Sequence, residues 1–221
     1  SHWNVELTND PQFLPTIKAA GCQFVYIQIG KTADNSLKDY WEYAKGVAMA
    51  CEDAEILYGF YYLTEADVES EMYMELWFIT KFFDTLSTLD LKSNKLPFVL
   101  DFEADGKEKV EEQEQLKLLI NHLHSEDIIP VIYSSESMLS KLEETLQNPN
   151  QEYWMANHAL DETGIAPGQM PATMRENPRI ICWQYTDDEN LLYERGVDTK
   201  EQPIDRDLMP YNVWAYYKGL E

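Results

Sequence analysis

Short apolar runs alternate along the chain with longer segments in which apolar residues recur every three or four positions. The short runs are rich in β-branched and aromatic residues and predict strands, whereas the periodic segments predict helices. The predicted strands are residues 24–30, 56–63, 96–103, 128–134, 152–157, 179–185 and 204–205. Helices are predicted over 11–20, 36–53, 67–86, 107–124 and a segment ending at 146, and a Gly/Pro-rich loop over 163–178.

Strands that alternate with helices indicate a parallel sheet joined by right-handed crossovers. No glycine-rich phosphate loop follows any of these strands, which favours a barrel over a dinucleotide-binding fold. We therefore predict an α/β fold, an irregular (β/α)8 TIM-like barrel, as a single domain over residues 1–221. The first strand of such a barrel is expected to be truncated or missing at the N-terminus, before Ser1.

The composition limits the classes of molecule that this chain could bind. The chain has 221 residues, 44% of them hydrophobic, which is enough for one core of barrel size. Its formal net charge of −23 argues firmly against binding to nucleic acid or to an anionic membrane. No apolar run approaches the roughly 20 residues that span a bilayer.

The three cysteines are far apart, without metal-ligand spacing, and predict buried free thiols. No residue cluster indicates a metal or organic cofactor.

The third predicted strand carries the clearest chemical signal. It reads Leu-Pro-Phe-Val-Leu-Asp-Phe-Glu over residues 96–103, an apolar run typical of a strand buried on both faces. Asp101 and Glu103 would share one face, with Cα atoms about 6.6–7 Å apart. Repulsion and partial desolvation tend to leave one such acid protonated and the other ionised, as in a glycosidase. The residues alone leave open a structural pair held by backbone amides or an arginine.

Further candidates lie at the predicted carboxyl ends of other strands, where a barrel places its active site. They are Tyr61, Tyr62, Tyr133, Asn157, His158, Gln184, Tyr185 and Asp205. The rings of Tyr62, Tyr133, Trp154 and Trp183 have the flat faces that stack on sugars, but rings of this kind also fill barrel cores.

Eight segments in order resemble glycoside hydrolase family 25, the Chalaropsis-type lysozymes (N-acetylmuramidases) of bacteria and phages. The Trp-Gln-Tyr signature at residues 183–185 and the Asp-x-Glu strand are the most specific of them. The others are Ser1-His2-Trp3, Ala19-Ala20-Gly21 with Phe24-Val25-Tyr26-Ile27, Gly59-Phe60-Tyr61-Tyr62, residues 130–134, Tyr153-Trp154-Met155-Ala156 and Ile204-Asp205-Arg206-Asp207.

The resemblance implies hydrolysis of the β-1,4 bond between N-acetylmuramic acid and N-acetylglucosamine in peptidoglycan. Glu103 would be the general acid. Asp101 would stay ionised and either stabilise the transition state or orient the acetamido group of the sugar. Asp205 would be a third catalytic acid. The implied substrate-binding residues are Tyr61, Tyr62, Tyr133, Trp154, His158, Trp183 and Gln184.

The same resemblance implies where the protein works and with what. The partner would be the glycan strands of bacterial peptidoglycan, bound by a monomer. The location would be extracellular or the cell wall, reached by secretion or, for a phage-encoded protein, by release at lysis. Neither nucleic acid nor a membrane is expected as a partner, in agreement with the strong negative charge.

Three positions depart from the family pattern. The family's aspartate two residues before the serine that matches Ser1 is not part of this chain, Gln28 replaces an Arg or Lys, and Tyr62 replaces a histidine. These departures leave open an alternative function: a catalytically impaired muramidase-like barrel that is a wall-binding or structural module of a phage or secretion apparatus. A glycosidase for chitin-like polymers is a third reading.

Overall fold

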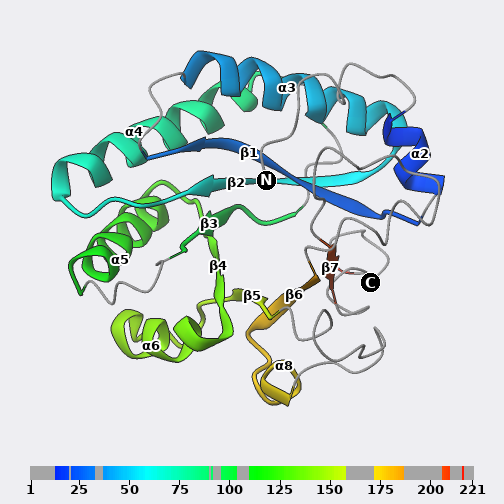
Figure 1. The fold of residues 1–221 in the computed structure, drawn as a ribbon. Coiled ribbons are helices and arrows are strands. Elements are labelled where there is room, and N and C mark those ends of the chain that lie inside the picture. Colours follow the sequence, from blue (N-terminus) through cyan, green and yellow to red (C-terminus); the bar gives the residue numbers. More distant parts are fainter. Residues whose placement is uncertain are drawn as a thin grey trace.

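A computed structural model describes residues 13–19, 21–32, 37–89, 91, 96–103, 110–157, 172–186, 206–209 and 216. Helices and strands alternate along these ranges (Figure 1). The strands are β1 (Phe24–Lys31), β2 (Leu57–Leu63), β3 (Val99–Asp101), β4 (Val131–Ser135), β5 (Tyr153–Ala156), β6 (Ile180–Thr186) and β7 (Arg206–Leu208). The helices are α2 (Phe13–Ala19), α3 (Leu37–Ala54), α4 (Glu69–Leu86), α5 (Val110–Ser125), α6 (Glu136–Leu146) and α8 (Ala172–Glu176).

The strands form one sheet in which each strand pairs with its neighbours in sequence, from β1 to β7. The pairs from β1 to β6 are parallel, as predicted. The prediction is wrong for the last strand, because β7 runs antiparallel to β6. An antiparallel pair needs no helical crossover, so the alternation of strands and helices did not indicate this reversal.

Two other expectations concern single elements. The loop predicted over 163–178 contains the short helix α8. The strand predicted at 204–205 lies outside the described residues, and β7 begins directly after it, at Arg206. The barrel's first strand is expected before Ser1, truncated or missing, and residues 1–12 lie outside the described part of the chain.

Four helices end in a way that turns the chain directly into the next segment. A residue with positive φ follows each of α2, α3, α5 and α6, namely Gly21, Glu55, Asp127 and Gln147. After α2, α3 and α5, the next amide donates to a carbonyl five residues back, for example from Ile56 N–H to Cys51 O at 3.0 Å. This left-handed helix end satisfies otherwise unpaired carbonyls. It also fixes where each following strand enters the sheet.

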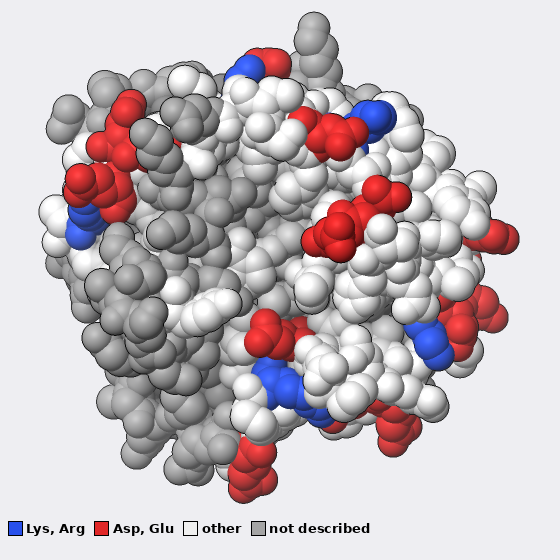
Figure 2. Space-filling model, turned by 180° about the vertical axis from the view of Figure 1, so that it is seen from behind, with Lys and Arg blue, Asp and Glu red and all other residues white. Residues whose placement is uncertain are grey.

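Exposed acidic residues lie on several helices. Glu69, Glu111 and Glu144, on three different helices, are all exposed. Figure 2 shows Asp and Glu scattered over the described part of one face, with Lys and Arg as isolated spots. The negative charge expected from the sequence is therefore spread over the described surface and does not converge on one element.

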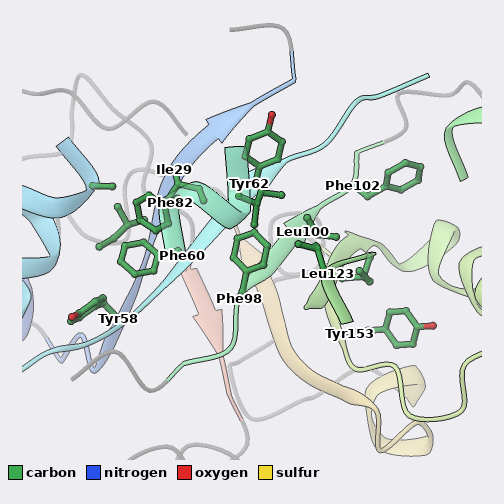
Figure 3. Close-up of a cluster of buried hydrophobic side chains, with 14 of the residues drawn as sticks. Ile29, Tyr58, Phe60, Tyr62, Phe82, Phe98, Leu100, Phe102, Leu123 and Tyr153 are labelled. Carbon is green, nitrogen blue, oxygen red and sulfur yellow. The ribbon is translucent and has the colours of Figure 1, made fainter. Parts of the chain in front are cut away.

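The hydrophobic core has two parts, one on each face of the sheet. The larger part lies between the sheet and the helices and includes Tyr58, Phe60 and Tyr62 from β2 (Figure 3). The smaller part lies on the inner, concave face and includes Leu57 from β2, with Tyr61 packed beside it. This separation follows from the alternation of side chains along a strand, which sends odd and even positions to opposite faces.

The sheet is strongly curled. The rings of Tyr26 on β1 and Trp154 on β5 are 4.7 Å apart between centroids, although three strands separate β1 from β5. In a flat sheet these strands would be about 19 Å apart. Gly59 makes the curl possible, because a Cβ atom there would lie 2.6 Å from Cε1 of Tyr26. The inner face of the sheet is thus closed by side chains that meet across it.

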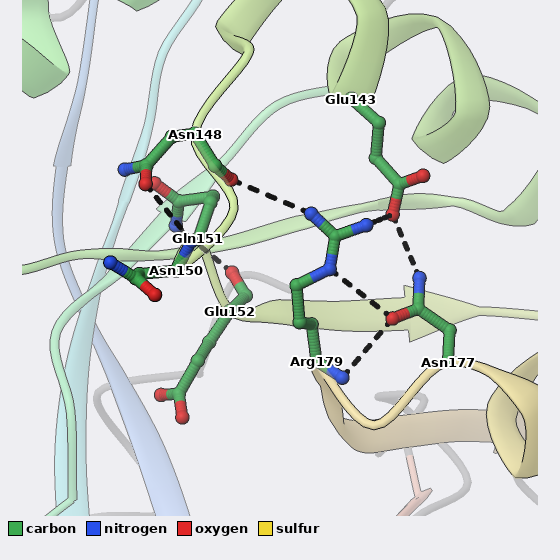
Figure 4. Close-up of polar contacts among 7 residues, drawn as sticks. All are labelled: Glu143, Asn148, Asn150, Gln151, Glu152, Asn177 and Arg179. Atoms are coloured by element: carbon green, nitrogen blue, oxygen red, sulfur yellow. Dashed lines mark hydrogen bonds and ion pairs between the residues drawn. The ribbon is translucent and has the colours of Figure 1, made fainter.

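A polar network fastens α6 to the amino-terminal end of β6 (Figure 4). Arg179 Nη2 lies 2.5 Å from Glu143 Oε1, and each side chain is 29% exposed. Asn177 Nδ2 donates to the same carboxylate oxygen at 2.7 Å, and Arg179 N–H donates to Asn177 Oδ1 at 3.1 Å. The Arg179 guanidinium also lies 5.5 Å from the centroid of the Tyr153 ring. One cation therefore holds a helix, a turn and a strand together.

Replacing Arg179 with methionine is expected to lower the free energy of unfolding by about 2 kcal/mol, because a half-buried carboxylate loses its charged hydrogen-bond donor. Lys81→Met is the matched control, since the Lys81–Asp84 pair is mostly exposed and surface pairs contribute about 0–1 kcal/mol. Urea denaturation of the three proteins measures both changes. Equal losses from the two substitutions would contradict a structural role for the Arg179 network.

The cysteines are free thiols, as predicted. Cys51 and Cys182 are buried and Cys22 is half-buried. Burial raises the pKa of Cys22 to about 11 and that of Cys51 to about 12, so both thiols are protonated at neutral pH. Protonated, buried thiols are poor nucleophiles, and these cysteines contribute packing.

Candidate active site

The carboxyl end of β3 carries the two acids that the sequence singled out. Leu100 and Phe102 belong to the core between the sheet and the helices, whereas Val99 belongs to the inner core. Alternation therefore directs Asp101 and Glu103 to the inner side of the sheet. Asp101 is half-buried, with Oδ1 shielded from solvent, and Glu103 is exposed. The two carboxyl groups thus have different access to water.

The backbone that presents these acids is fastened on both sides. On the β2 side, Thr64 N–H donates to the carbonyl of Asp101 at 2.9 Å. On the β4 side, Phe102 N–H donates to the carbonyl of Tyr133 at 2.9 Å, and Ser134 Oγ donates to the carbonyl of Phe102 at 2.8 Å. Backbone hydrogen bonds therefore continue beyond Asp101, and they hold the end of the strand rigidly at the residues that carry the two acids.

The strands that follow β3 carry a second set of polar side chains. Tyr133 is the register partner of Asp101, and its hydroxyl donates to Gln184 Oε1 at 2.5 Å. Gln184 lies on β6 and is only 4% exposed. Beside them, Trp154 donates through Nε1 to Asp207 Oδ1 at 3.0 Å, and its ring contacts Tyr133 edge-on at 5.4 Å. The structure therefore brings Asp101, Tyr133, Trp154 and Gln184 together on the inner side of the sheet, near the carboxyl ends of the parallel strands.

Two of the other sequence-derived candidates, Tyr62 and Trp183, lie on the opposite side of the sheet. Tyr62 is 2% exposed, in the core between sheet and helices, with its ring 5.5 Å from that of Phe78. Trp183 is also in this core, 1% exposed, and its Nε1 donates to the carbonyl of Asn157 at 2.9 Å. Tyr61 is half-buried on the inner side. Asp205 and His158 lie outside the described residues.

The sequence did not predict a role for two acids near these strand ends. Asp207 belongs to the segment Ile204-Asp205-Arg206-Asp207 and has no role predicted from sequence, yet it accepts a hydrogen bond from Trp154 and pairs with Gln184 in register. Glu75 is 1% exposed, three residues after Met72 and three before Phe78 on the buried face of α4. A charged residue on an apolar helix stripe is costly unless it is paired. That position in the stripe was the signal for Glu75.

The arrangement suits acid-assisted cleavage of a sugar bond. An exposed and a half-buried carboxyl group are two positions apart on the inner side of the strand end. The register partner of Asp101, Tyr133, is hydrogen-bonded to the amide of Gln184. Within the described ranges, no group of three His, Cys, Asp or Glu side chains could hold a metal ion. A pair of carboxyl groups at the carboxyl end of the strands is typical of glycoside hydrolases.

The chain belongs to glycosyl hydrolases family 25, whose family model matches residues 1–192. It is therefore a glycoside hydrolase, and the resemblance seen in the sequence is confirmed. A search of curated proteins gave no match.

Several solved structures share the fold. The catalytic domain of the endolysin ply40, from bacteriophage P40 of Listeria monocytogenes, superposes with a TM-score of 0.63 at 16% identity, and 99% of each chain is covered. For GHIP, a glycosyl hydrolase 25 of Streptococcus pneumoniae, the TM-score is 0.61 at 12% identity, covering 86% of this chain and 79% of that one. The autolysin LytC of Streptococcus pneumoniae, in complex with a synthetic peptidoglycan ligand, gives 0.52 at 18% identity, covering 79% of this chain and 39% of that one.

Proposed function

We propose that this chain is a muramidase that hydrolyses the β-1,4 bond between N-acetylmuramic acid and N-acetylglucosamine in peptidoglycan. The observation that carries the proposal is the placement of Asp101 and Glu103 on the inner side at the end of β3, in a chain of glycosyl hydrolases family 25. LytC was solved with a peptidoglycan ligand and ply40 is an endolysin, which supports peptidoglycan as the substrate class.

In this proposal Glu103 is the general acid. Its exposed side chain can reach the glycosidic oxygen and donate a proton as the bond to the anomeric carbon breaks. A bound glycan would exclude water from Glu103 and favour its protonated form before the reaction. Water then supplies the hydroxyl group to the anomeric carbon, and the remaining proton returns to the Glu103 carboxylate.

Asp101 is assigned the ionised role. It is more buried than Glu103, and a negative charge there would stabilise the positive charge that develops on the sugar ring. The Tyr133 hydroxyl and the Gln184 amide would fix the sugar beside it, since they are already held together at 2.5 Å. Trp154, Tyr61, His158 and Asp205 complete the proposed site, Asp205 as a third acid.

The rest of the proposal concerns architecture and location. We assign residues 1–221 to a single catalytic domain and a monomer, and we propose that the curled sheet closes into an irregular barrel. The contact between Tyr26 and Trp154 across the inner face supports closure. The substrate places the enzyme outside the cell or in the cell wall, after secretion or phage-induced lysis. With a charge of −23, specific contacts with the glycan would have to hold it there.

The test is to identify the newly formed reducing ends after digestion of purified peptidoglycan. The products are reduced with borohydride and analysed by mass spectrometry, with chitooligosaccharides as the comparison substrate. We expect reduced N-acetylmuramic acid ends and little cleavage of chitooligosaccharides. Reduced N-acetylglucosamine ends would overturn the assignment of the bond, and failure to release any ends would overturn the proposed activity.

A further inference from the structure

Glu75 is an acid buried between α4 and the carboxyl ends of β1 and β2. Its side chain is 1% exposed and lies on the helix face that also buries Met72, Phe78 and Phe82. Within the described part of the chain, no lysine or arginine pairs with it, although a buried carboxylate normally has such a partner. The catalytic scheme above does not use this residue.

Two threonine hydroxyl groups bind the carboxylate instead. Thr32 Oγ1 donates to Glu75 Oε1, and Thr64 Oγ1 donates to Glu75 Oε2 at 2.8 Å. Thr32 follows β1 and Thr64 follows β2, so Glu75 joins the ends of two neighbouring strands. Thr32 Oγ1 also accepts a hydrogen bond from the Glu65 amide at 2.6 Å. The turn after β2 is therefore held around this single carboxylate.

The same turn holds the proposed catalytic strand. The backbone amide of Thr64 donates to the carbonyl of Asp101 at 2.9 Å, while the hydroxyl group of Thr64 donates to Glu75. One residue thus joins Glu75 to the end of β3. Thr64 is 4% exposed, so its side chain has few other positions available.

We propose that Glu75 is a positioning residue: by holding Thr64 through its carboxylate, it fixes the backbone of Asp101 and, with it, the placement of the two proposed catalytic acids. The inference rests on the proposed function for its kinetic consequence but not for its structural one. Glu75 itself lies on the helix side of the sheet and is not expected to contact substrate.

The ionisation of Glu75 then has a consequence near neutral pH. Burial raises its pKa from 4.5 to about 7, the hydrogen bonds from Thr32, Thr64 and the Glu65 backbone oppose this rise, and the charge of Glu71 adds to it. The other titratable groups that face it are Tyr62 and Glu65, at the end of β2. Hydrogen bonds to an ionised acceptor are the stronger ones, so the strand end is held best above pH 7.

The experiment compares wild type with Glu75→Gln, which keeps the shape of the protonated side chain. We expect kcat on a soluble peptidoglycan fragment to be about tenfold lower in the variant at pH 8.5 and nearly equal to wild type at pH 5, where Glu75 itself is protonated. KM should change little. The ratio of the two rates at each pH is compared, because it removes the pH dependence that both proteins share.

The matched control is Glu69→Gln, an exposed acid on the same helix, which should show the wild-type rate at every pH. A Glu75→Gln deficit that is constant with pH would indicate a merely structural residue and would overturn the inference. Equal rates at both pH values would overturn it as well.

Two further measurements do not depend on activity. Amide hydrogen exchange at Thr64 should be about tenfold faster in Glu75→Gln than in wild type at pH 8, with unchanged exchange at Leu119 of α5. Unchanged exchange at Thr64 would overturn the positioning role even if no peptidoglycan were cleaved. If Glu75→Gln lost protection at Thr64 while the wild-type protein cleaved no peptidoglycan, the proposed function would be rejected and this inference would be kept.

Thermal unfolding gives the sign of the burial effect. The folded-state pKa lies above the unfolded value, so the folded protein binds the proton more tightly and wild type loses stability as pH rises from 4.5 through 7. Glu75→Gln lacks this loss. Its Tm, relative to wild type, should rise by about 5 °C between pH 5 and pH 8. A difference in Tm that is independent of pH would contradict the titration of Glu75 in this range.

Discussion

Glu103→Gln is expected to lower kcat on peptidoglycan about a thousandfold, because the amide keeps the shape of the side chain but has no proton to give to the leaving oxygen. The loss should be in kcat, since the same glycan contacts remain. Glu103 is exposed, so the free energy of unfolding should change by less than about 0.5 kcal/mol. Release of reducing ends and urea denaturation measure the two effects separately.

Glu111→Gln is the control for this substitution, because Glu111 is an exposed acid on α5 away from the end of β3. It should retain the wild-type rate. If Glu103→Gln kept more than a tenth of the wild-type rate, Glu103 would not be the general acid, and another group would have to protonate the leaving oxygen.

Asp101→Asn is expected to lower kcat about a hundredfold while KM changes by less than threefold. A negative charge that stabilises the transition state more than the bound substrate acts on kcat, and the neutral amide removes it. Initial rates on a soluble peptidoglycan fragment, measured over a range of concentrations, give the two constants separately.

Asp84→Asn provides the comparison, since Asp84 is an exposed acid paired with Lys81 on α4. It should leave both constants unchanged. A loss in Asp101→Asn that falls mainly on KM would assign Asp101 to holding the substrate in its ground state, and the proposed charge stabilisation would then be wrong.

Most of the fold could be predicted from sequence because its signals are local. Strand alternation and helix periodicity depend on residues within a few positions of one another, and they located the elements from α2 to β6 other than α8. The direction of β7 depends on its pairing with β6, for example Asp207 with Gln184, and no local pattern encodes that pairing. The short helix α8 was missed for a related reason, since five residues are too few for periodicity to register.

In the candidate site, too, the residues placed by a local pattern could be predicted, and those placed by contacts between distant segments could not. Asp101 and Glu103 could be assigned to one face because two positions along a strand suffice to place them there. The sequence left Tyr61 and Tyr62 as alternatives at the same strand end. Only the packing of Tyr62 against Phe78 separates them, by placing Tyr62 among the helices. Glu75 was missed because its partners Thr32 and Thr64 lie 43 and 11 residues away in sequence.

The order of the strands has a consequence for synthesis. Each strand from β2 to β6 pairs with the one made just before it, so a nascent chain can add strand and covering helix together as it leaves the ribosome. The groups around Asp101 arrive in stages: Tyr133 with β4, Gln184 with β6 and Asp207 only with β7. Much of the sheet and its covering helices can therefore assemble before these polar partners are in place. The surroundings of Asp101 would be among the last parts of the molecule to reach their final structure.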